Sequence, residues 1–177
     1  MKELAARVLL IGYGNPGRRD DGLGPALAGF VEDMGIPGVT VDSNYQLCVE
    51  DAEAVANHDV VIFADADEKG QEPFSFKRVA PKPALSFSSH VLDPPALMAM
   101  SRELFGASVE GYALGIRGYE FDHFNESLTE KAKENMALAL DFLKSLLSDS
   151  SFRRPRVEGG GTALLSDEEE KWKTPKI

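Results

Sequence analysis

Three short apolar stretches, separated by segments with helical periodicity, most constrain how this chain can fold. They are "RVLLIGY" at 7–13, "DVVIFAD" at 59–65 and "EGYALGI" at 110–116. Each has the length of a strand, and a continuous apolar run is typical of a strand that is buried on both faces. Strands that alternate with helices form mostly parallel sheets. The pattern therefore predicts an α/β fold with helices on both faces of the sheet.

Weaker signals predict two more strands and the first two helices. Residues 38–42 and 74–79 alternate in polarity, and the prolines after the second segment indicate an edge strand. A helix is expected over 22–34, with Asp20 or Asp21 as its N-cap and one apolar face made of Leu23, Leu27, Phe30, Val31 and Met34. Residues 48–57 predict a second helix.

Two further helices are expected in the second half of the chain. Asp93, followed by two prolines, predicts an N-cap for a helix that ends near Gly106 and carries Leu97, Met100 and Leu104. Ser127 and Glu130 form a capping-box pattern before a long final helix. Its apolar face comprises Leu128, Ala132, Met136, Leu143 and Leu147.

The periodic pattern ends at residue 147, which sets the expected domain boundary. Residues 1–147 are long enough for one domain with a substantial core. Residues 148–177 are polar, glycine-rich and carry charge in blocks, a composition that predicts a flexible tail. No internal repeat is present in the sequence.

Composition excludes several classes of function. A net charge of −10 repels phosphate backbones, and the only basic cluster, at 153–156, lies in the predicted tail, so nucleic acid is not an expected partner. No apolar run approaches the length that spans a bilayer. A single cysteine and the absence of a secretory signal pattern predict a protein of the cytoplasm.

The segment "IGYGNPGRRDDGLG" at 11–24 permits two opposite interpretations. Gly12, Gly14 and Gly17 follow a strand as G-x-G-x-x-G, and Asp42 lies where a ribose-binding acid would be expected, so a nucleotide-binding (NAD-type) oxidoreductase is one candidate. However, glycines and prolines continue to Pro25, which delays the helix whose N-terminus would meet a pyrophosphate. Asp20 and Asp21 would also repel that group. The loop therefore favours a positively charged ligand over a phosphate.

Topology brings a second set of polar residues toward this loop. In the common 2-1-3 strand order, Asp21 after the first strand and Asp65 at the end of the third would be neighbours. His90 lies in a loop just before a helix. Two carboxylates and one imidazole suit a divalent transition metal such as nickel or zinc.

Each of these residues also has an ordinary structural interpretation. Either aspartate of the loop could cap the next helix, Asp65 or Asp67 could close a turn, and His90 could be a surface or capping residue. His58 has a structural interpretation, Cys48 has no evident base beside it, and His123 beside Asp122 remains open. Spacing alone does not decide between these interpretations.

In combination, "GYGNPGRRDDGLG", "VVIFADA" and "SSH" resemble the hydrogenase maturation endopeptidases, which trim the large subunit of nickel–iron ([NiFe]) hydrogenases. The family pattern is G-x-G-N, four residues, Asp, an acidic residue and then glycines. It is matched here by Gly12, Gly14, Asn15, Asp20, Asp21, Gly22 and Gly24. The resemblance covers residues 6–147 and implies a twisted five-stranded sheet in a three-layer fold.

The resemblance also implies a site and an activity. The family's metal-binding trio maps onto Asp21, Asp65 and His90, which would serve as both catalytic and metal-binding residues. Asp21 replaces a glutamate that is common in the family, and Asp20 is expected to orient the loop. The implied activity is an aspartyl-type endopeptidase that removes the C-terminal extension of the large-subunit precursor once nickel is inserted. Nickel would arrive within the substrate, and zinc or cadmium could substitute for it. A monomer is expected.

Two segments depart from the family pattern, and two alternatives remain open. Residues 42–52 and 115–130 differ from many relatives and are expected to border the site and select the precursor. The alternatives to a protease are the NAD-type oxidoreductase and a nickel chaperone that binds the precursor without cutting it.

Overall fold

The structure, a computed structural model, describes residues 5–83, 92–149 and 152. It contains a five-stranded sheet with the strand order β2-β1-β3-β5-β4. The bounds are β1 Val8–Tyr13, β2 Val39–Asn44, β3 Val60–Asp67, β4 Phe74–Val79 and β5 Glu110–Arg117. The first three strands and β5 run parallel, whereas β4 pairs with β5 in the antiparallel direction. The predicted α/β class, the mostly parallel sheet and the edge position of 74–79 are confirmed.

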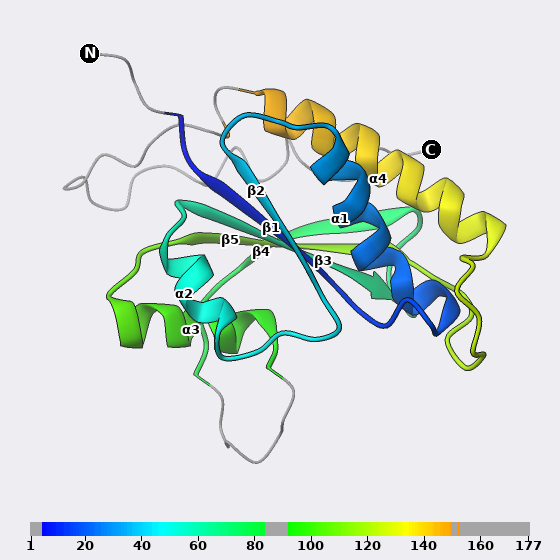
Figure 1. The fold of residues 1–177 in the computed structure, drawn as a ribbon, viewed down its shortest axis with the longest axis horizontal. Coiled ribbons are helices and arrows are strands. Elements are labelled where there is room, and N and C mark those ends of the chain that lie inside the picture. Colours follow the sequence, from blue (N-terminus) through cyan, green and yellow to red (C-terminus); the bar gives the residue numbers. More distant parts are fainter. Residues whose placement is uncertain (1–4, 84–91, 150–151, 153–177) are drawn as a thin grey trace.

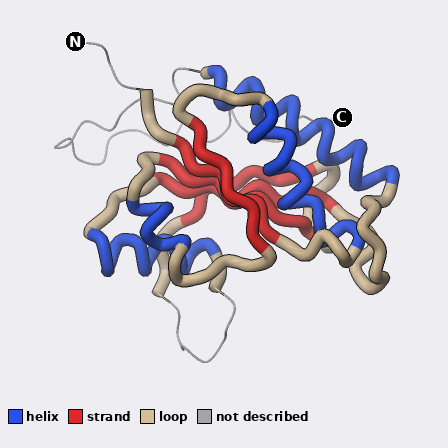
Figure 2. The backbone as a smooth tube through the Cα atoms, viewed as in Figure 1, coloured by secondary structure: helices blue, strands red, loops and turns tan. Residues whose placement is uncertain are grey.

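Helices cover both faces of the sheet, which makes the fold three-layered (Figure 1). One face carries α1 (Leu23–Asp33) and α4 (Glu130–Ser148), and the other carries α2 (Asp51–Ala56) and α3 (Pro94–Phe105). Figure 2 shows the twist of the sheet between these two layers. A short 3-10 helix, η1 (Arg19–Gly22), precedes α1. Among the described helices, none combines the length and the apolar character needed to cross a membrane.

The central strands are buried on both sides, as their continuous apolar runs predict. Successive side chains of a strand point to opposite faces, so alternate residues enter different cores. Leu10 and Ile62 pack in the cluster beneath α1 and α4, whereas Ile11 and Phe63 pack in the cluster beneath α2 and α3. All four side chains are at most 1% exposed.

The N-caps of two helices differ from the sequence expectation, whereas that of α3 agrees with it. Asp93 Oδ1 accepts from the Ala96 amide at 2.9 Å, as expected. The capping box at Ser127 is wrong, because the Ser127 hydroxyl donates to Asn125 Oδ1 and Thr129 caps α4 instead. Gly22 is the N-cap of α1 and no side chain bonds there, so the expected cap by Asp20 or Asp21 is wrong as well.

Two predicted core residues lie outside the core. Phe30 is 52% exposed because it lies at the border of the buried stripe of α1, and Leu104 is 63% exposed in the last turn of α3, beyond the last buried residue of that helix. The expected tail, 148–177, falls almost entirely outside the described residues.

The strand order determines where a ligand can bind. The chain moves from β1 outward to β2, and then crosses back to place β3 on the other side of β1. The order therefore reverses between β1 and β3. In open α/β sheets, this switch point at the carboxyl ends of the strands is the usual position of a ligand site.

Candidate active and metal site at the carboxyl edge of the sheet

The loop after β1 uses its backbone amides within the protein. From Gly14 to Asp21, each amide that carries a hydrogen donates to a protein oxygen. The acceptors, in chain order, are Asn44 O, Asp21 Oδ2, Asn15 Oδ1, Asn15 O, Asn125 O, Glu120 O and Arg18 O. A phosphate-binding loop needs such amides free to point at the ligand. This loop has none to offer between those residues, which opposes the interpretation of the motif as a pyrophosphate site.

The motif glycines serve close packing between β1 and α1. A Cβ on Gly12 would collide with the Gly24 carbonyl and with Ala28, and one on Gly24 would collide with the carbonyls of Tyr13 and Ala64. Gly14 has a φ of 139°, a conformation that L side chains rarely adopt. The first turn of α1 is thus pressed against the ends of β1 and β3.

Asp20 is a structural residue that holds the loop after β5 in place. It is fully buried, and its carboxylate accepts four hydrogen bonds, from the amides of Tyr119, Glu120 and Thr129 and from the Thr129 hydroxyl, at 2.8–3.2 Å. Burial alone would raise its pKa, but these donors outweigh burial, and the pKa of Asp20 is lowered. The expectation that Asp20 orients the loop agrees with this network.

Asp21 is held in a different way, and it remains partly exposed. Its Oδ2 accepts from the Asn15 amide at 2.9 Å, which fixes the carboxylate across the loop. The 3-10 helix that carries Asp21 contacts β3. The loop therefore brings Asp21 toward the end of the neighbouring strand.

Asp65 lies near the end of β3, with Asp21 close enough to influence its ionisation. Its pKa is raised to about 6, mainly by burial and further by the charges of Asp21 and Asp67. Hydrogen bonds from the Ala66 amide, at 2.8 Å, and from the Tyr13 hydroxyl act in the opposite direction without restoring the ordinary value. Asp21 and Asp65 are thus two carboxylates that repel each other at a half-buried edge. A cation placed there would relieve this repulsion, and carboxylate oxygens are suitable ligands for divalent metals.

Tyr13 is a member of this site that sequence reasoning missed. It is the last residue of β1, and the β1–β3 register that pairs Gly12 with Ala64 brings it beside Asp65. Its hydroxyl donates to the Asp65 carboxylate. Burial, Asp65 and the charge of Asp93 all raise the pKa of Tyr13, so the phenol stays protonated. The strand alternation of 7–13 could have revealed this placement, because residues 9, 11 and 13 share a face.

The third expected ligand, His90, lies outside the described residues. Within the described ranges, no three His, Cys, Asp or Glu side chains gather into a group that could hold a metal. The nearest described residue of the same connection with a role at this edge is Asp93, whose charge acts on Tyr13. The residue that caps α3 thus lies near Tyr13, and the assignment of His90 stays a prediction.

The other residues singled out in the sequence have structural roles or lie apart. Asp67 Oδ1 accepts from the Lys69 amide and closes a turn, and His58 bonds Ala54 O and Thr40 Oγ1 at 2.7 and 2.9 Å. Burial and the nearby carboxylate of Asp51 raise the pKa of Cys48, which disfavours a reactive thiolate. His123 is exposed on the loop after β5.

Comparison with known proteins finds similarity in structure but not in sequence families. No protein-family model matches the chain, and no curated protein matches its sequence. Among solved structures, the nickel–iron hydrogenase maturation protease HycI from Thermococcus kodakarensis KOD1 superposes with a TM-score of 0.65 at 22% identity, over 82% of this chain and 94% of that one. The hydrogenase maturating endopeptidase HybD from E. coli gives 0.62 at 20% identity, over 80% and 91%.

The chain has the fold of the hydrogenase maturation proteases. The similarity covers nearly the whole of those enzymes and agrees with the resemblance found in the sequence. An uncharacterized protein from Wolinella succinogenes has the same fold, with a TM-score of 0.56 at 27% identity, over 80% of this chain and 96% of that one. The five-stranded, three-layer architecture expected from the resemblance is confirmed.

Proposed function

We propose that this protein is an endopeptidase that removes the C-terminal extension of a nickel-loaded hydrogenase large-subunit precursor. The observation that carries the proposal is the repelling pair Asp21 and Asp65 at the switch point of this particular fold. The fold is that of proteins named as hydrogenase maturation proteases. Within the described part of the chain, the site has two carboxylates and no paired Ser or Cys nucleophile, which favours attack by water over a covalent intermediate.

Nickel enters this proposal as part of the substrate. Asp21 and Asp65, together with His90, would bind the nickel held by the precursor and thereby place the adjoining peptide bond at the carboxylates. Docking of a cation also offsets the charge repulsion that raises the pKa of Asp65. Only loaded precursor would then be held in position for cleavage, because an empty precursor lacks the charge that the pair requires.

The chain's own residues would then act on water and on the peptide. A carboxylate of the pair accepts a proton as water adds to the scissile carbonyl, and that proton passes to the departing amine when the C–N bond breaks. Tyr13 holds Asp65 in place through its hydroxyl. The reaction is a hydrolysis of aspartyl type in which the carboxylates remain unmodified.

Two loops beside the site are suited to recognise the precursor. Gly14 donates to Asn44 O, which ties residues 44–50 to the motif loop, and residues 17 and 19 bond Asn125 on the other side. These loops expose large apolar side chains, among them Tyr45 at 73% and Phe124 at 95%. Exposed aromatic residues beside a site are common anchors for a protein partner. We expect them to contact the precursor, and we expect a monomer acting in the cytoplasm without nucleic acid or membrane.

The experiment that tests the function is the intact mass of the precursor from the same organism, measured before and after incubation with this protein. Loss of one fixed C-terminal peptide, only from nickel-loaded precursor, is the expected result. Asp21→Ala and His90→Ala should abolish it, whereas Asp33→Asn, at an exposed carboxylate of α1 outside the trio, should leave it unchanged. An unchanged precursor mass with wild-type protein would overturn the protease. Nickel binding without cleavage would then indicate a chaperone, and stabilisation by NAD alone an oxidoreductase.

A further inference from the structure

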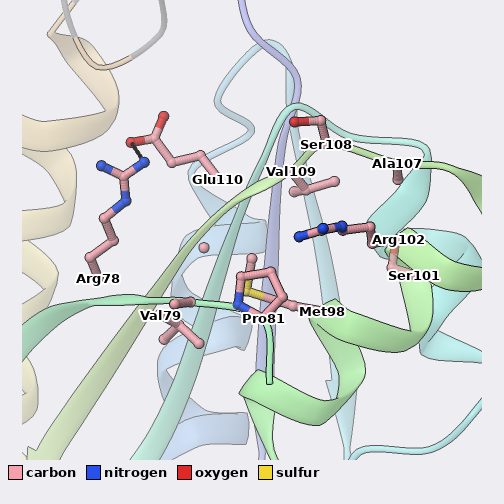
Figure 3. A pocket seen from close by; sticks show the side chains of 12 residues that line it. Arg78, Val79, Pro81, Met98, Ser101, Arg102, Ala107, Ser108, Val109 and Glu110 are labelled. Carbon is pink, nitrogen blue, oxygen red and sulfur yellow. Dashed lines mark ion pairs between the residues drawn. The ribbon is translucent and has the colours of Figure 1, made fainter. Parts of the chain in front are cut away.

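A second concave site lies at the opposite edge of the sheet from Asp21 and Asp65. It is bounded by the end of β4, the start of β5 and the second half of α3, and its volume is about 260 Å³ (Figure 3). β5 begins here at Glu110, which pairs with Val60 at the start of β3. The amino end of β5 thus faces this cavity, whereas Asp65 lies toward the carboxyl end of the neighbouring β3.

Apolar side chains form part of the cavity wall. Val79, Pro81, Met98 and Val109 contribute side chains to it. Gly111 makes room for the sulfur of Met98, because a Cβ at that position would collide with Met98 Sδ. A cavity of this size is below the usual range for drug-sized ligands, so it suits a molecule of only a few carbon atoms.

The charges around the cavity leave one arginine without an ion pair. Arg78 lies 3.6 Å from Glu110 Oε1, and that oxygen also accepts from the Tyr112 hydroxyl at 2.5 Å. Arg102 forms no ion pair with any residue that the structure describes. Its guanidinium instead extends from α3 across the cavity beneath Val109 (Figure 3). In a chain of net charge −10, a guanidinium without a carboxylate partner at a cavity favours an anion.

A buried hydroxyl beside Arg102 also lacks a partner. Ser101 is 1% exposed and lines the cavity, and its Oγ has no hydrogen-bond partner within the described ranges. Leaving a buried hydroxyl unbonded is unfavourable, so such groups are rare in folded proteins unless a ligand or water bonds them. Arg102 and Ser101 come from adjacent positions of α3 and provide an ionic and a neutral donor at one wall.

We propose that this cavity binds a small organic anion with one carboxylate and a short apolar body. The Arg102 guanidinium binds the carboxylate, the Ser101 hydroxyl donates to it, and the hydrocarbon part packs on Met98 and Val109. A single negative charge is favoured over the two charges of a phosphate, because Glu110 lies at the rim and only one arginine is uncommitted. The apolar part of the wall, at Met98 and Val109, favours a ligand with a hydrocarbon part over a bare inorganic ion. This site is independent of the proposed protease activity.

The test is an NMR titration of the full-length protein with butyrate, using butyramide and inorganic phosphate as comparison probes. Saturable shifts are expected for butyrate alone, at the amides of residues 98–102 and 109–111. Arg102→Gln should weaken binding about tenfold, since it removes a charge-assisted bond, and Ser101→Ala about threefold. Lys77→Gln, which removes an exposed cation of β4 outside the cavity, should change nothing.

Three results would overturn the proposal. They are equal shifts with butyramide, stronger binding of phosphate than of butyrate, or unaltered butyrate affinity in Arg102→Gln. Arg102 is exposed on the surface of α3, so its substitution should leave the fold intact, and the amide spectrum of the variant checks this directly. Precursor cleavage is measured separately, so a failure of the cavity proposal and a failure of the protease proposal are distinguishable.

Discussion

Asp20 and Asp65 are aspartates at the same edge of the sheet, yet the fold treats them in opposite ways. Asp20 receives four donors and has a lowered pKa. Asp65 receives two, lies near another carboxylate and has a pKa raised to about 6. Protein donors satisfy the hydrogen-bonding capacity of the Asp20 carboxylate, whereas they satisfy that of Asp65 only in part. A residue whose bonding the fold leaves incomplete is the better candidate for binding something else.

The largest expected effect comes from removing the fully hydrogen-bonded carboxylate of Asp20. Asp20→Ala leaves three amides and one hydroxyl unbonded at a buried position, so the free energy of unfolding should fall by about 3 kcal/mol or more. Urea denaturation measures the change. Asp122→Ala, at an exposed acidic residue of the same loop, should cost less than about 0.5 kcal/mol. A small loss at Asp20 would show that the loop after β5 does not depend on it.

Replacing the Asp65 carboxylate should change the free energy of unfolding in the opposite direction. Burial and repulsion oppose the ionised form of Asp65, so Asp65→Asn should raise the free energy of unfolding at pH 7 by up to about 3 kcal/mol. The same variant should lose precursor cleavage. Asp33→Asn, at an exposed aspartate of α1 away from this edge, is the control and should do neither.

The pH dependence of stability separates the two carboxylates further. A carboxyl whose pKa is raised on folding binds its proton more tightly in the native state. Its stabilising contribution to the folded state is therefore complete below the unfolded-state pKa, near 3.8, and is lost as the pH rises to about 6. The advantage of Asp65→Asn over wild type should accordingly grow between pH 4 and pH 6 and then stay constant. Asp20 has the opposite sign, because its lowered pKa stabilises the fold above 3.8. Urea midpoints across this range measure both, and an advantage that does not vary with pH would contradict the assignment.

Tyr13→Phe sharpens the comparison by removing one of the two hydrogen-bond donors of Asp65. Losing the hydroxyl donor should raise the pKa of Asp65 further and reduce the rate of cleavage, with a change in stability of about 1 kcal/mol. The measurement is the pH profile of cleavage, whose acid limb should move to higher pH. Tyr45→Phe, at an exposed tyrosine of the neighbouring loop, should leave the profile in place.

The sequence predicted most of the fold because the fold depends on patterns that a sequence displays. The continuous apolar runs of β1, β3 and β5 identify buried parallel strands, and the prolines after Val79 identify the edge strand. The N-cap of α4 was mispredicted because Ser127 and Thr129 are equally suitable in sequence. The hydrogen bonds that Thr129 donates to Asp20, 109 residues away, select Thr129.

The site was predictable in part for the same reason. Strand order brings the ends of β1 and β3 together, so the pairing of Asp21 with Asp65 follows from topology. The division of roles between Asp20 and Asp21 does not, since the two are adjacent and chemically identical. It is decided by which carboxylate the loop after β5 reaches. Tyr13 was missed because a tyrosine at the end of an apolar strand is typical of a core residue.

The smallest expected effect extends the comparison to the cavity at the amino end of β5, where the Ser101 hydroxyl has no hydrogen-bond partner among the described residues. Ser101→Ala removes a buried hydroxyl without a described partner, so it should stabilise the protein by about 1 kcal/mol, part of which is helix propensity. Ser145→Ala, at an exposed position of α4, measures the propensity part alone. A larger gain at Ser101 than at Ser145 would mean that the fold accepts an unbonded hydroxyl at this cavity, as a binding site requires. A loss at Ser101 would mean that water already completes the hydroxyl, and the difference between the two edges would then disappear.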